Sequence, residues 1–259
     1  MSILVTHAED GRLALLTLNA GKGNILDTAV IRELQGALLS VAGDPCLRAV
    51  VLTAEGPHFS FGASVPEHRR DQVGAMLPTF HALVQTLLEY PLPLWAAVSG
   101  NCLGGGLELA LATHRIFAHP GALFGQPEIK LGVFAPAGSA LLAERLGQPQ
   151  AERLLLTGAT VNAMQAHELG LVDELCGDGE LPQAAAARFA KPLLGLSSSS
   201  LRFAVRAARQ GFVERALQRL RSLEQLYLSE LVATPDANEG IAAFLEKRAP
   251  VWKDEGAQR

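Results

Sequence analysis

Near the middle of the chain stands the stretch Ser99-Gly100-Asn101-Cys102-Leu103-Gly104-Gly105-Gly106-Leu107-Glu108. An apolar segment at residues 94 to 98 precedes it and predicts a buried strand, and residues 107 to 112 predict a helix. Glycines let a ligand approach the backbone closely, and N–H groups at a helix N-terminus favour an anion. We therefore expect a ligand-binding turn between a strand and a helix that carries Glu108. The alternative is a tight turn with a solvated glutamate.

The glycine-rich stretch does not match two common phosphate-binding loops. It lacks the Gly-Lys-Ser/Thr ending of a Walker A loop, and three adjacent glycines do not have the Gly-x-Gly-x-x-Gly spacing of a dinucleotide-binding turn. Neither kind of nucleotide site is predicted.

A second loop lies upstream and has a similar setting. It reads His58-Phe59-Ser60-Phe61-Gly62-Ala63-Ser64-Val65 and follows a predicted strand at residues 49 to 53. The Gly62-Ala63 pair offers a second backbone N–H donor to a ligand, although an ordinary loop accounts equally for these residues alone.

A third feature lies downstream, at Gly125-Gln126-Pro127-Glu128. Its neighbours Phe124, Ile129, Leu131 and Val133 are apolar and predict a buried place for Glu128. Desolvation raises the pKa of a buried carboxyl group, which suits a general acid; the alternative is an exposed surface turn. Taken together, the three features predict two backbone donors for a thioester oxygen and two carboxyl groups for water and a proton.

The order of the predicted elements indicates an α/β fold. A hairpin at residues 3 to 7 and 12 to 18 is followed by alternating strands and helices, including a helix capped by Asp27 and one from about residue 71 to 90 that Pro78 can interrupt. Beyond residue 180 the pattern is helical, with helices expected at residues 181–191, 201–210, 212–231 and 235–247. We expect a catalytic core at residues 1–180 and a helical module at residues 181–259.

Composition excludes several classes of protein. The 259 residues have a net charge of −4 and are 49% hydrophobic, so there is a sizeable core and no broad basic field for nucleic acid or an anionic membrane. Three scattered cysteines predict neither a disulfide framework nor a metal site. Apolar runs are too short for a membrane span and the N-terminus is unlike a signal peptide, so we expect a cytoplasmic protein.

Motifs along nearly the whole chain resemble those of the crotonase (enoyl-CoA hydratase/isomerase) superfamily. They are Leu15-Leu16-Thr17-Leu18-Asn19, Phe59-Ser60-Phe61-Gly62-Ala63, Gly104-Gly105-Gly106-Leu107-Glu108, Phe124-Gly125-Gln126-Pro127-Glu128, Leu156-Thr157-Gly158, Gly170-Leu171-Val172 and Ala243-Phe244-Leu245-Glu246-Lys247-Arg248. The resemblance implies a ββα spiral core with a C-terminal helical trimerisation module. It also implies an oxyanion hole formed by the N–H groups of Ala63 and Gly105, with Glu108 as the base and Glu128 as the acid of a hydratase. Coenzyme A would enter as part of the acyl-CoA thioester substrate, with no metal or separate cofactor.

Two segments depart from the family pattern. Ser64 stands where an acidic residue usually follows Gly-Ala, and the segment from Val133 to Ser139 replaces a Gly-Ala-Gly-Gly-Thr turn. Both departures resemble the hydratases of cyclohexa-1,5-diene-1-carbonyl-CoA in anaerobic aromatic degradation, which implies a hydratase of a cyclic dienoyl-CoA. The alternatives are an enoyl-CoA hydratase or isomerase for linear acyl chains and, from another class, a non-catalytic scaffold or RNA-binding relative.

Further residues are expected at the substrate and between subunits. Phe61, Ser64, Val65 and Phe134 are candidates for the acyl pocket, and Lys22 and Lys247 for the phosphates of coenzyme A. Taken singly, each lysine is more simply explained as a solvated surface residue. An apolar stripe on the C-terminal helices predicts a homotrimer or a dimer of trimers. Its members are Leu217, Leu220, Leu223, Leu226 and Leu231.

Overall fold

The computed structural model describes residues 1–254. A six-stranded sheet forms the centre of the protein. The strand order is β1-β2-β3-β4-β6-β9. The first two strands form the predicted antiparallel hairpin, and the others are added in parallel. The strands are β1 (Ile3–Ala8), β2 (Leu13–Leu18), β3 (Ala49–Ala54), β4 (Leu94–Val98), β6 (Arg115–Ala118) and β9 (Glu174–Leu175). This alternation of strands and helices confirms the α/β class.

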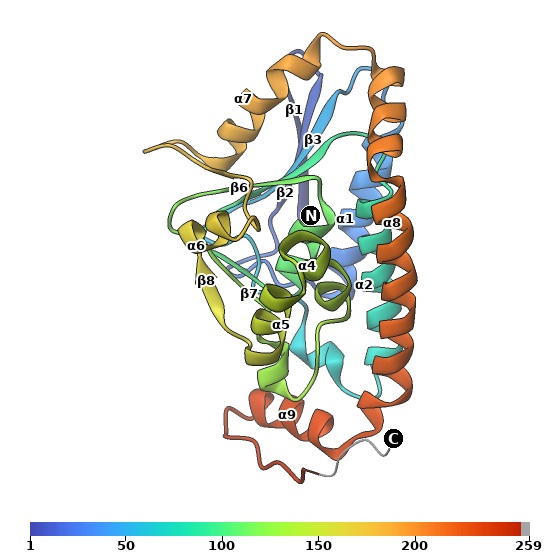
Figure 1. Ribbon diagram of the computed structural model, residues 1–259, viewed down its shortest axis with the longest axis vertical. Helices are drawn as coiled ribbons and strands as arrows, with labels where there is room; N and C mark the ends of the chain where they lie inside the picture. Colours follow the sequence, from blue (N-terminus) through green and yellow to red (C-terminus); the bar gives the residue numbers. More distant parts are fainter. Residues whose placement is uncertain (255–259) are drawn as a thin grey trace.

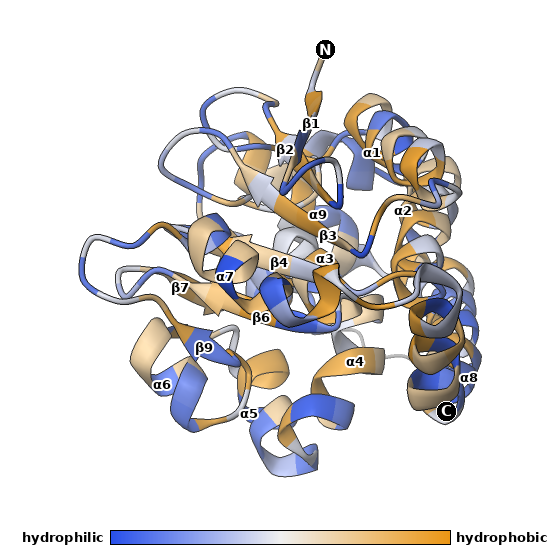
Figure 2. Cartoon of the chain, turned by 90° about the horizontal axis from the view of Figure 1, so that it is seen from above, coloured by the Kyte–Doolittle hydropathy of each residue, from blue (hydrophilic) through white to orange (hydrophobic). Residues whose placement is uncertain are grey.

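Helices cover both faces of the sheet, so its central strands β3, β4 and β6 are almost entirely buried. Every residue of β4 is buried, which is typical of a parallel strand between two helical layers, and Figure 2 shows the hydrophobic colour concentrated on the interior strands β3 and β6. The helices are α1 (Thr28–Ala42), α2 (Val73–Leu88), α3 (Gly105–Ala112), α4 (Pro136–Leu146), α5 (Gln148–Thr157), α6 (Ala163–Glu168), α7 (Pro182–Leu194), α8 (Ser198–Ser229) and α9 (Pro235–Leu245). Short 3₁₀ turns are η1 (Val65–His68), η2 (Pro127–Leu131) and η3 (Leu231–Ala233).

Local sequence explains where helix α1 begins. The side chain of Asp27 accepts a 2.8 Å hydrogen bond from the N–H of Val30 and caps α1 as predicted, a contact that contributes about 1 kcal/mol. On the other face of the sheet, the ring of Phe189 of α7 packs edge to face on Trp95, with a centroid distance of 5.4 Å, and at a tilt on Phe117, with a centroid distance of 5.6 Å. The predicted division at residue 180 stays a prediction, and α7, which lies beyond it, packs on β3, β4 and β6.

A small second sheet brings the three sequence features together. In it β5 (Asn101–Leu103) pairs in parallel with β7 (Leu123–Gly125), which pairs with β8 (Thr160–Asn162). The N–H of Gly104 donates to the carbonyl of Gly125 at 2.9 Å, so the glycine-rich turn and the loop of Glu128 start from adjacent points. Isolated bridges between Ser60 and Cys102 and between Leu26 and Ala63 bring the upstream loop to the same place.

Two predicted helix breaks are absent from residues 1–254. Pro78 lies inside α2, where its missing N–H costs roughly 3 kcal/mol, but buried neighbours such as Phe80 and Leu83 hold the helix on the core. Gly211 likewise lies inside α8, so the predicted helices 201–210 and 212–231 are one helix. A helical glycine costs only about 1 kcal/mol, which the packing of Ala216, Leu217 and Leu220 offsets.

The long helix α8 runs along the side of the molecule next to α2 and ends near α9 (Figure 1). It also packs on α4 and thereby reaches the region where the loops of the small sheet meet. None of the helices in the described part of the chain combines the length and apolar character needed to cross a membrane.

Candidate active site

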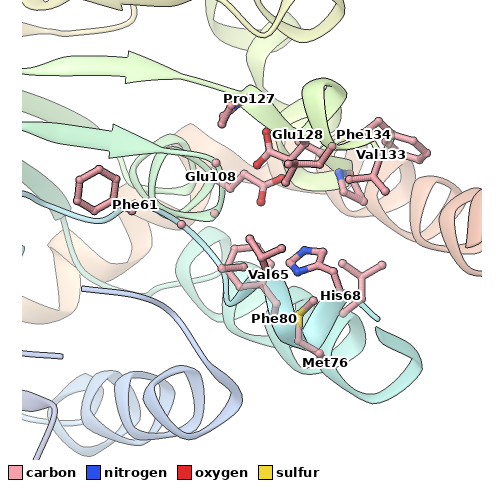
Figure 3. A pocket seen from close by; sticks show the side chains of 18 of the residues that line it. Phe61, Val65, His68, Met76, Phe80, Glu108, Pro127, Glu128, Val133 and Phe134 are labelled. Atoms are coloured by element: carbon pink, nitrogen blue, oxygen red, sulfur yellow. The ribbon is translucent and has the colours of Figure 1, made fainter. Parts of the chain in front are cut away.

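A cavity of about 640 Å³ lies where these loops meet α2, the start of α4, α8 and α9. Most of its lining is apolar, and it contains both predicted glutamates. Figure 3 shows Glu108 and Glu128 close to one another, with Phe61 on one side and Phe134 on the other. An apolar cavity with a few convergent polar groups is the usual form of a small-molecule site.

The backbones of the two glycine-bearing loops touch beside the glutamates. A Cβ placed on Gly62 would lie 3.1 Å from the nitrogen of Gly105, and a Cβ on Gly105 would lie 3.0 Å from the nitrogen of Ala63. Both Ala63 and Gly105 line the cavity, and within residues 1–254 neither N–H donates a hydrogen bond. Two adjacent unpaired donors of this kind can hold an oxygen that gains negative charge during a reaction.

Glu108 projects from the first turn of α3 and is 5% exposed. Its Oε1 accepts a 2.6 Å hydrogen bond from the backbone N–H of Gly138, in the first turn of α4. Burial raises the pKa of Glu108, while the N–H groups of Gly138 and Ala137 and the nearby His81 limit the rise. The N-terminus of α4 therefore supports a negative charge on Glu108.

Glu128 lies in the 3₁₀ turn η2 and is partly buried. Burial, followed by repulsion from Glu108, raises the pKa of Glu128 to about 8. Gly104 closes the space beside it, because a Cβ on Gly104 would lie 2.5 Å from Oε1 of Glu128. Gly104 also has a φ of +51°, a conformation that side chains rarely adopt.

Gln126 connects the surroundings of the two carboxyl groups. Its side-chain amide is buried against Gly138, and with the NH₂ turned toward Glu128 it donates to Oε2 at 3.0 Å and to Oε1 at 3.2 Å. An amide can donate to a carboxylate or accept from a carboxylic acid, so Gln126 can form a hydrogen bond with Glu128 in either protonation state.

A histidine–glutamate pair lies behind the site, with His81 buried and Glu224 partly exposed. Nδ1 of His81, on α2, is 2.5 Å from Oε2 of Glu224, on α8. His81 is 5% exposed, and its positive charge lowers the pKa of Glu108. The pair thus adds to the helix N-terminus in favouring ionised Glu108 over ionised Glu128.

This geometry gives the two carboxyl groups different tasks. Glu108 has groups that stabilise its anion, which suits a proton acceptor, whereas the pKa of Glu128 is raised to about 8, which suits a proton donor. The two unpaired N–H groups beside them can bind the carbonyl oxygen of a substrate, so the site can perform acid–base chemistry next to an activated carbonyl.

Some of the other predicted site residues line the cavity, and others lie outside its lining. Phe61, Val65 and Phe134 line the cavity, as do the wall residues Val133, Ala135 and Pro136. Ser64 is not among the lining residues; its carbonyl faces Nδ1 of His68 at 2.9 Å. Lys22 and Lys247 are exposed outside the cavity lining, and their contact with a coenzyme A phosphate stays a prediction.

Sequence reasoning missed several residues of the site. Gly138 stands within the segment from Val133 to Ser139 that departs from the family pattern, but no role was predicted for its N–H. Tyr227 lies far along the chain from the motifs, and its neighbours gave no sign of a role. Gln126 stood within a quoted motif, and its place directly before Pro127-Glu128 was a usable signal. His81 was hidden in an apolar helix, where a polar residue among Phe80, Leu83 and Val84 was the available sign.

Known proteins are similar to this chain along nearly its whole length. The model of the family described as enoyl-CoA hydratase/isomerase matches residues 8–255. Cyclohexa-1,5-dienecarbonyl-CoA hydratase of Thauera aromatica is 52% identical over 246 residues, which cover 95% of this chain and 94% of that protein. The 2,3-dehydroadipyl-CoA hydratase of Escherichia coli K12 is 35% identical, over 98% of this chain and 99% of its own.

Solved structures of similar proteins share the whole architecture. An enoyl-CoA hydratase/isomerase from Pseudoalteromonas atlantica T6c superposes with a TM-score of 0.85 at 28% identity, covering 97% of this chain and 100% of that one. One from Xanthobacter autotrophicus Py2 gives 0.86 at 28% identity, covering 95% and 93%. The predicted fold, a crotonase-type core with a helical C-terminal region, is thereby confirmed, and the chain belongs to the enoyl-CoA hydratase/isomerase family.

Proposed function

We propose that this protein is a hydratase that adds water to a conjugated acyl-CoA thioester. One observation carries the proposal: Glu108, which accepts a hydrogen bond from the N–H of Gly138, and Glu128, with its pKa raised to about 8, share one apolar cavity with two backbone N–H groups that are unpaired within residues 1–254. The hydratase names of the relatives from Thauera aromatica and Escherichia coli support the same reaction class.

In the proposed reaction the thioester oxygen binds the N–H groups of Ala63 and Gly105. Glu108 takes a proton from water as the water oxygen bonds to the electron-poor carbon, and the electrons of the double bond move toward the thioester oxygen as an enolate. Glu128 then transfers its proton to carbon, and the enolate electrons form the new C–H bond. Each carboxyl group contributes roughly 10²- to 10⁴-fold in this kind of proton transfer.

We propose a cyclic dienoyl group, cyclohexa-1,5-diene-1-carbonyl-CoA, as the acyl part. The ring is wider than a linear enoyl chain, and apolar side chains from Val133, Phe134 and Pro136 supply flat walls next to Glu128. The 52% identity with a hydratase named for this substrate supports the assignment. Coenzyme A enters as part of the substrate, with Lys22 and Lys247 at its phosphates.

We further propose that the C-terminal helices form the contacts of a homotrimer or a dimer of trimers. Leu226 of α8 is 42% exposed and Phe203 is 72% exposed, although other leucines of the predicted stripe, Leu217 and Leu220, pack on the chain's own core. Light scattering at micromolar concentration tests the assembly. A stable monomer would contradict it.

A substrate panel tests the function. Crotonyl-CoA, cyclohex-1-ene-carbonyl-CoA and cyclohexa-1,5-diene-1-carbonyl-CoA are incubated with the enzyme, and the addition of water is followed by mass. Pocket fit alone discriminates by about 10- to 200-fold, so we expect kcat/KM for the cyclic diene to exceed that for crotonyl-CoA by at least about tenfold.

The panel also separates the competing functions. Equal or reversed preference would assign the protein to linear enoyl-CoA substrates, and no turnover of any thioester would favour a non-catalytic relative. Glu128→Gln serves as the matched control, because it keeps the shape of the pocket but removes the proton donor.

A further inference from the structure

The two tyrosines of this chain are both buried but differ in how their hydroxyl groups are paired. The hydroxyl of Tyr90 donates a 2.9 Å hydrogen bond to the carbonyl of Leu38. The hydroxyl oxygen of Tyr227 is buried, yet within residues 1–254 it has no hydrogen-bond partner. Leaving a buried hydroxyl unpaired is costly, so the Tyr227 hydroxyl calls for an explanation that the Tyr90 hydroxyl does not need.

Helix α8 holds Tyr227 at the catalytic cavity through several contacts. Glu224, three residues earlier and on the same side of the helix, bonds His81 of α2, and Arg219 donates to the carbonyl of Ser139 in α4 at 3.0 Å. The ring of Tyr227 meets Phe134 edge to face at a centroid distance of 5.3 Å, and both residues line the cavity. The position of the phenol is therefore set by packing and not by its hydroxyl.

The surroundings of the hydroxyl include both catalytic carboxyl groups. Burial raises the pKa of Tyr227, and the charges of Glu128 and then Glu108 raise it further. The phenol consequently keeps its proton at any working pH and remains a hydrogen-bond donor. Ionised carboxylates only accept hydrogen bonds, so the phenol supplies a donor that Glu108 and Glu128 cannot supply.

We propose that the Tyr227 hydroxyl binds the oxygen atom that is added to the substrate, an inference that rests on the proposed hydratase function. A water molecule at this place would give one hydrogen to Glu108, use one lone pair to attack carbon and accept a hydrogen bond from Tyr227 on the other. In the reverse direction the same donor stabilises the oxygen that leaves carbon. The C-terminal helix α8 thus supplies a substrate-binding group to a site otherwise built mainly from residues before position 139.

The test compares Tyr227→Phe with Tyr90→Phe, two substitutions that each remove one buried hydroxyl and keep the ring. The assay uses the unsaturated thioester that the wild type hydrates, cyclohexa-1,5-diene-1-carbonyl-CoA or crotonyl-CoA, and its hydroxylated product as an inhibitor. In Tyr227→Phe we expect kcat to fall about tenfold, and the inhibition constant of the hydroxylated thioester to rise roughly 2- to 10-fold, because one hydrogen bond to the added oxygen is lost. KM for the unsaturated thioester, which lacks that oxygen, should stay near the wild-type value.

Thermal stability distinguishes function from structure in the same pair of variants. Tyr227→Phe should have an unchanged or higher Tm, because it removes an unpaired group, whereas Tyr90→Phe should have a lower Tm and unchanged kcat. Wild-type kcat and product affinity in Tyr227→Phe would overturn the proposal, and so would a Tm loss like that of Tyr90→Phe or an equal loss of affinity for both thioesters. If the wild type hydrates neither thioester, the proposed function itself fails, which is a distinct result.

Discussion

The backbone N–H of Gly138 donates a 2.6 Å hydrogen bond to Oε1 of Glu108, so the N-terminus of α4 faces the carboxyl group that α3 carries. This contact makes two glutamates in one cavity unequal, because burial and the charge of Glu108 together raise the pKa of Glu128 to about 8. The following expectations depend on that inequality or on the groups around it.

Replacing either glutamate by glutamine should reduce turnover by at least about 10²-fold, since each variant keeps the side-chain shape but loses the proton acceptor or donor. Steady-state rates with the preferred thioester and circular dichroism check activity and folding together. Glu152→Gln, which changes an exposed glutamate of α5, is the control and should behave like the wild type. Near-normal turnover in Glu108→Gln or Glu128→Gln would remove that residue from the mechanism.

The activity should decline as the pH rises through about 8, because Glu128 must be protonated to act as the acid and its pKa is raised to that value. A profile of kcat/KM against pH measures this limb. The folded chain also binds this proton between the ordinary pKa of 4.5 and about 8, whereas the unfolded chain does not, so the contribution of Glu128 to stability is lost as pH rises through that window. In Glu128→Gln this part of the pH dependence of unfolding should be absent; its persistence would assign the proton elsewhere.

Substituting Gly104 by alanine should reduce both activity and stability. The new Cβ would lie 2.5 Å from Oε1 of Glu128, and the backbone φ of +51° is strained for alanine, at a cost of roughly 1–3 kcal/mol. Gly36→Ala, in open space on α1, is the control and should raise the free energy of unfolding by about 0.5–1 kcal/mol without changing kcat. Urea unfolding and steady-state rates test both variants, and a fully active Gly104→Ala would show that Glu128 need not occupy its present position.

Replacing His81 by glutamine should move the acid limb of the kcat/KM profile to higher pH. The positive charge of His81 lowers the pKa of Glu108, so its loss leaves the base protonated over a wider range. Glu89→Gln, a change on the exposed side-chain pair with Gln85, should leave the limb in place. An unmoved limb in His81→Gln would mean that the His81–Glu224 pair only holds α2 against α8.

Removing the predicted phosphate-binding lysines should raise KM and leave kcat nearly unchanged, because a phosphate contact is the same in the ground state and the transition state. The variants are Lys22→Ala and Lys247→Ala, with Lys191→Ala on the exposed side of α7 as the control. Unchanged KM values would leave all three as ordinary surface lysines.

The sequence predicted the parts of the site that share a local pattern. Glu108 and Glu128 each follow a short strand and a glycine-bearing turn, and the pairing of β5 with β7 brings those turns together. The segment that contains Gly138 stood out in the sequence, but the contact of its N–H with Glu108 depends on where α4 packs. Tyr227 could not be found from local pattern, since its place at the cavity depends on where α8 packs. The same limit explains the two helix breaks that were wrong: Pro78 and Gly211 disfavour a helix locally, but the surrounding apolar residues hold both helices on the core.

The apolar wall of the cavity at residues 133 to 136 and the N–H of Gly138 that donates to Glu108 belong to one continuous stretch of backbone. The wall ends at Pro136, the first residue of α4, and Gly138 follows in the first turn of that helix. Substitutions at residues 133 to 136 that let the cavity accept a new acyl group can therefore also change the pKa of Glu108. The range of acyl groups and the proton affinity of Glu108 should therefore change together. Variant libraries at residues 133 to 136 should be screened for pH optimum as well as for substrate.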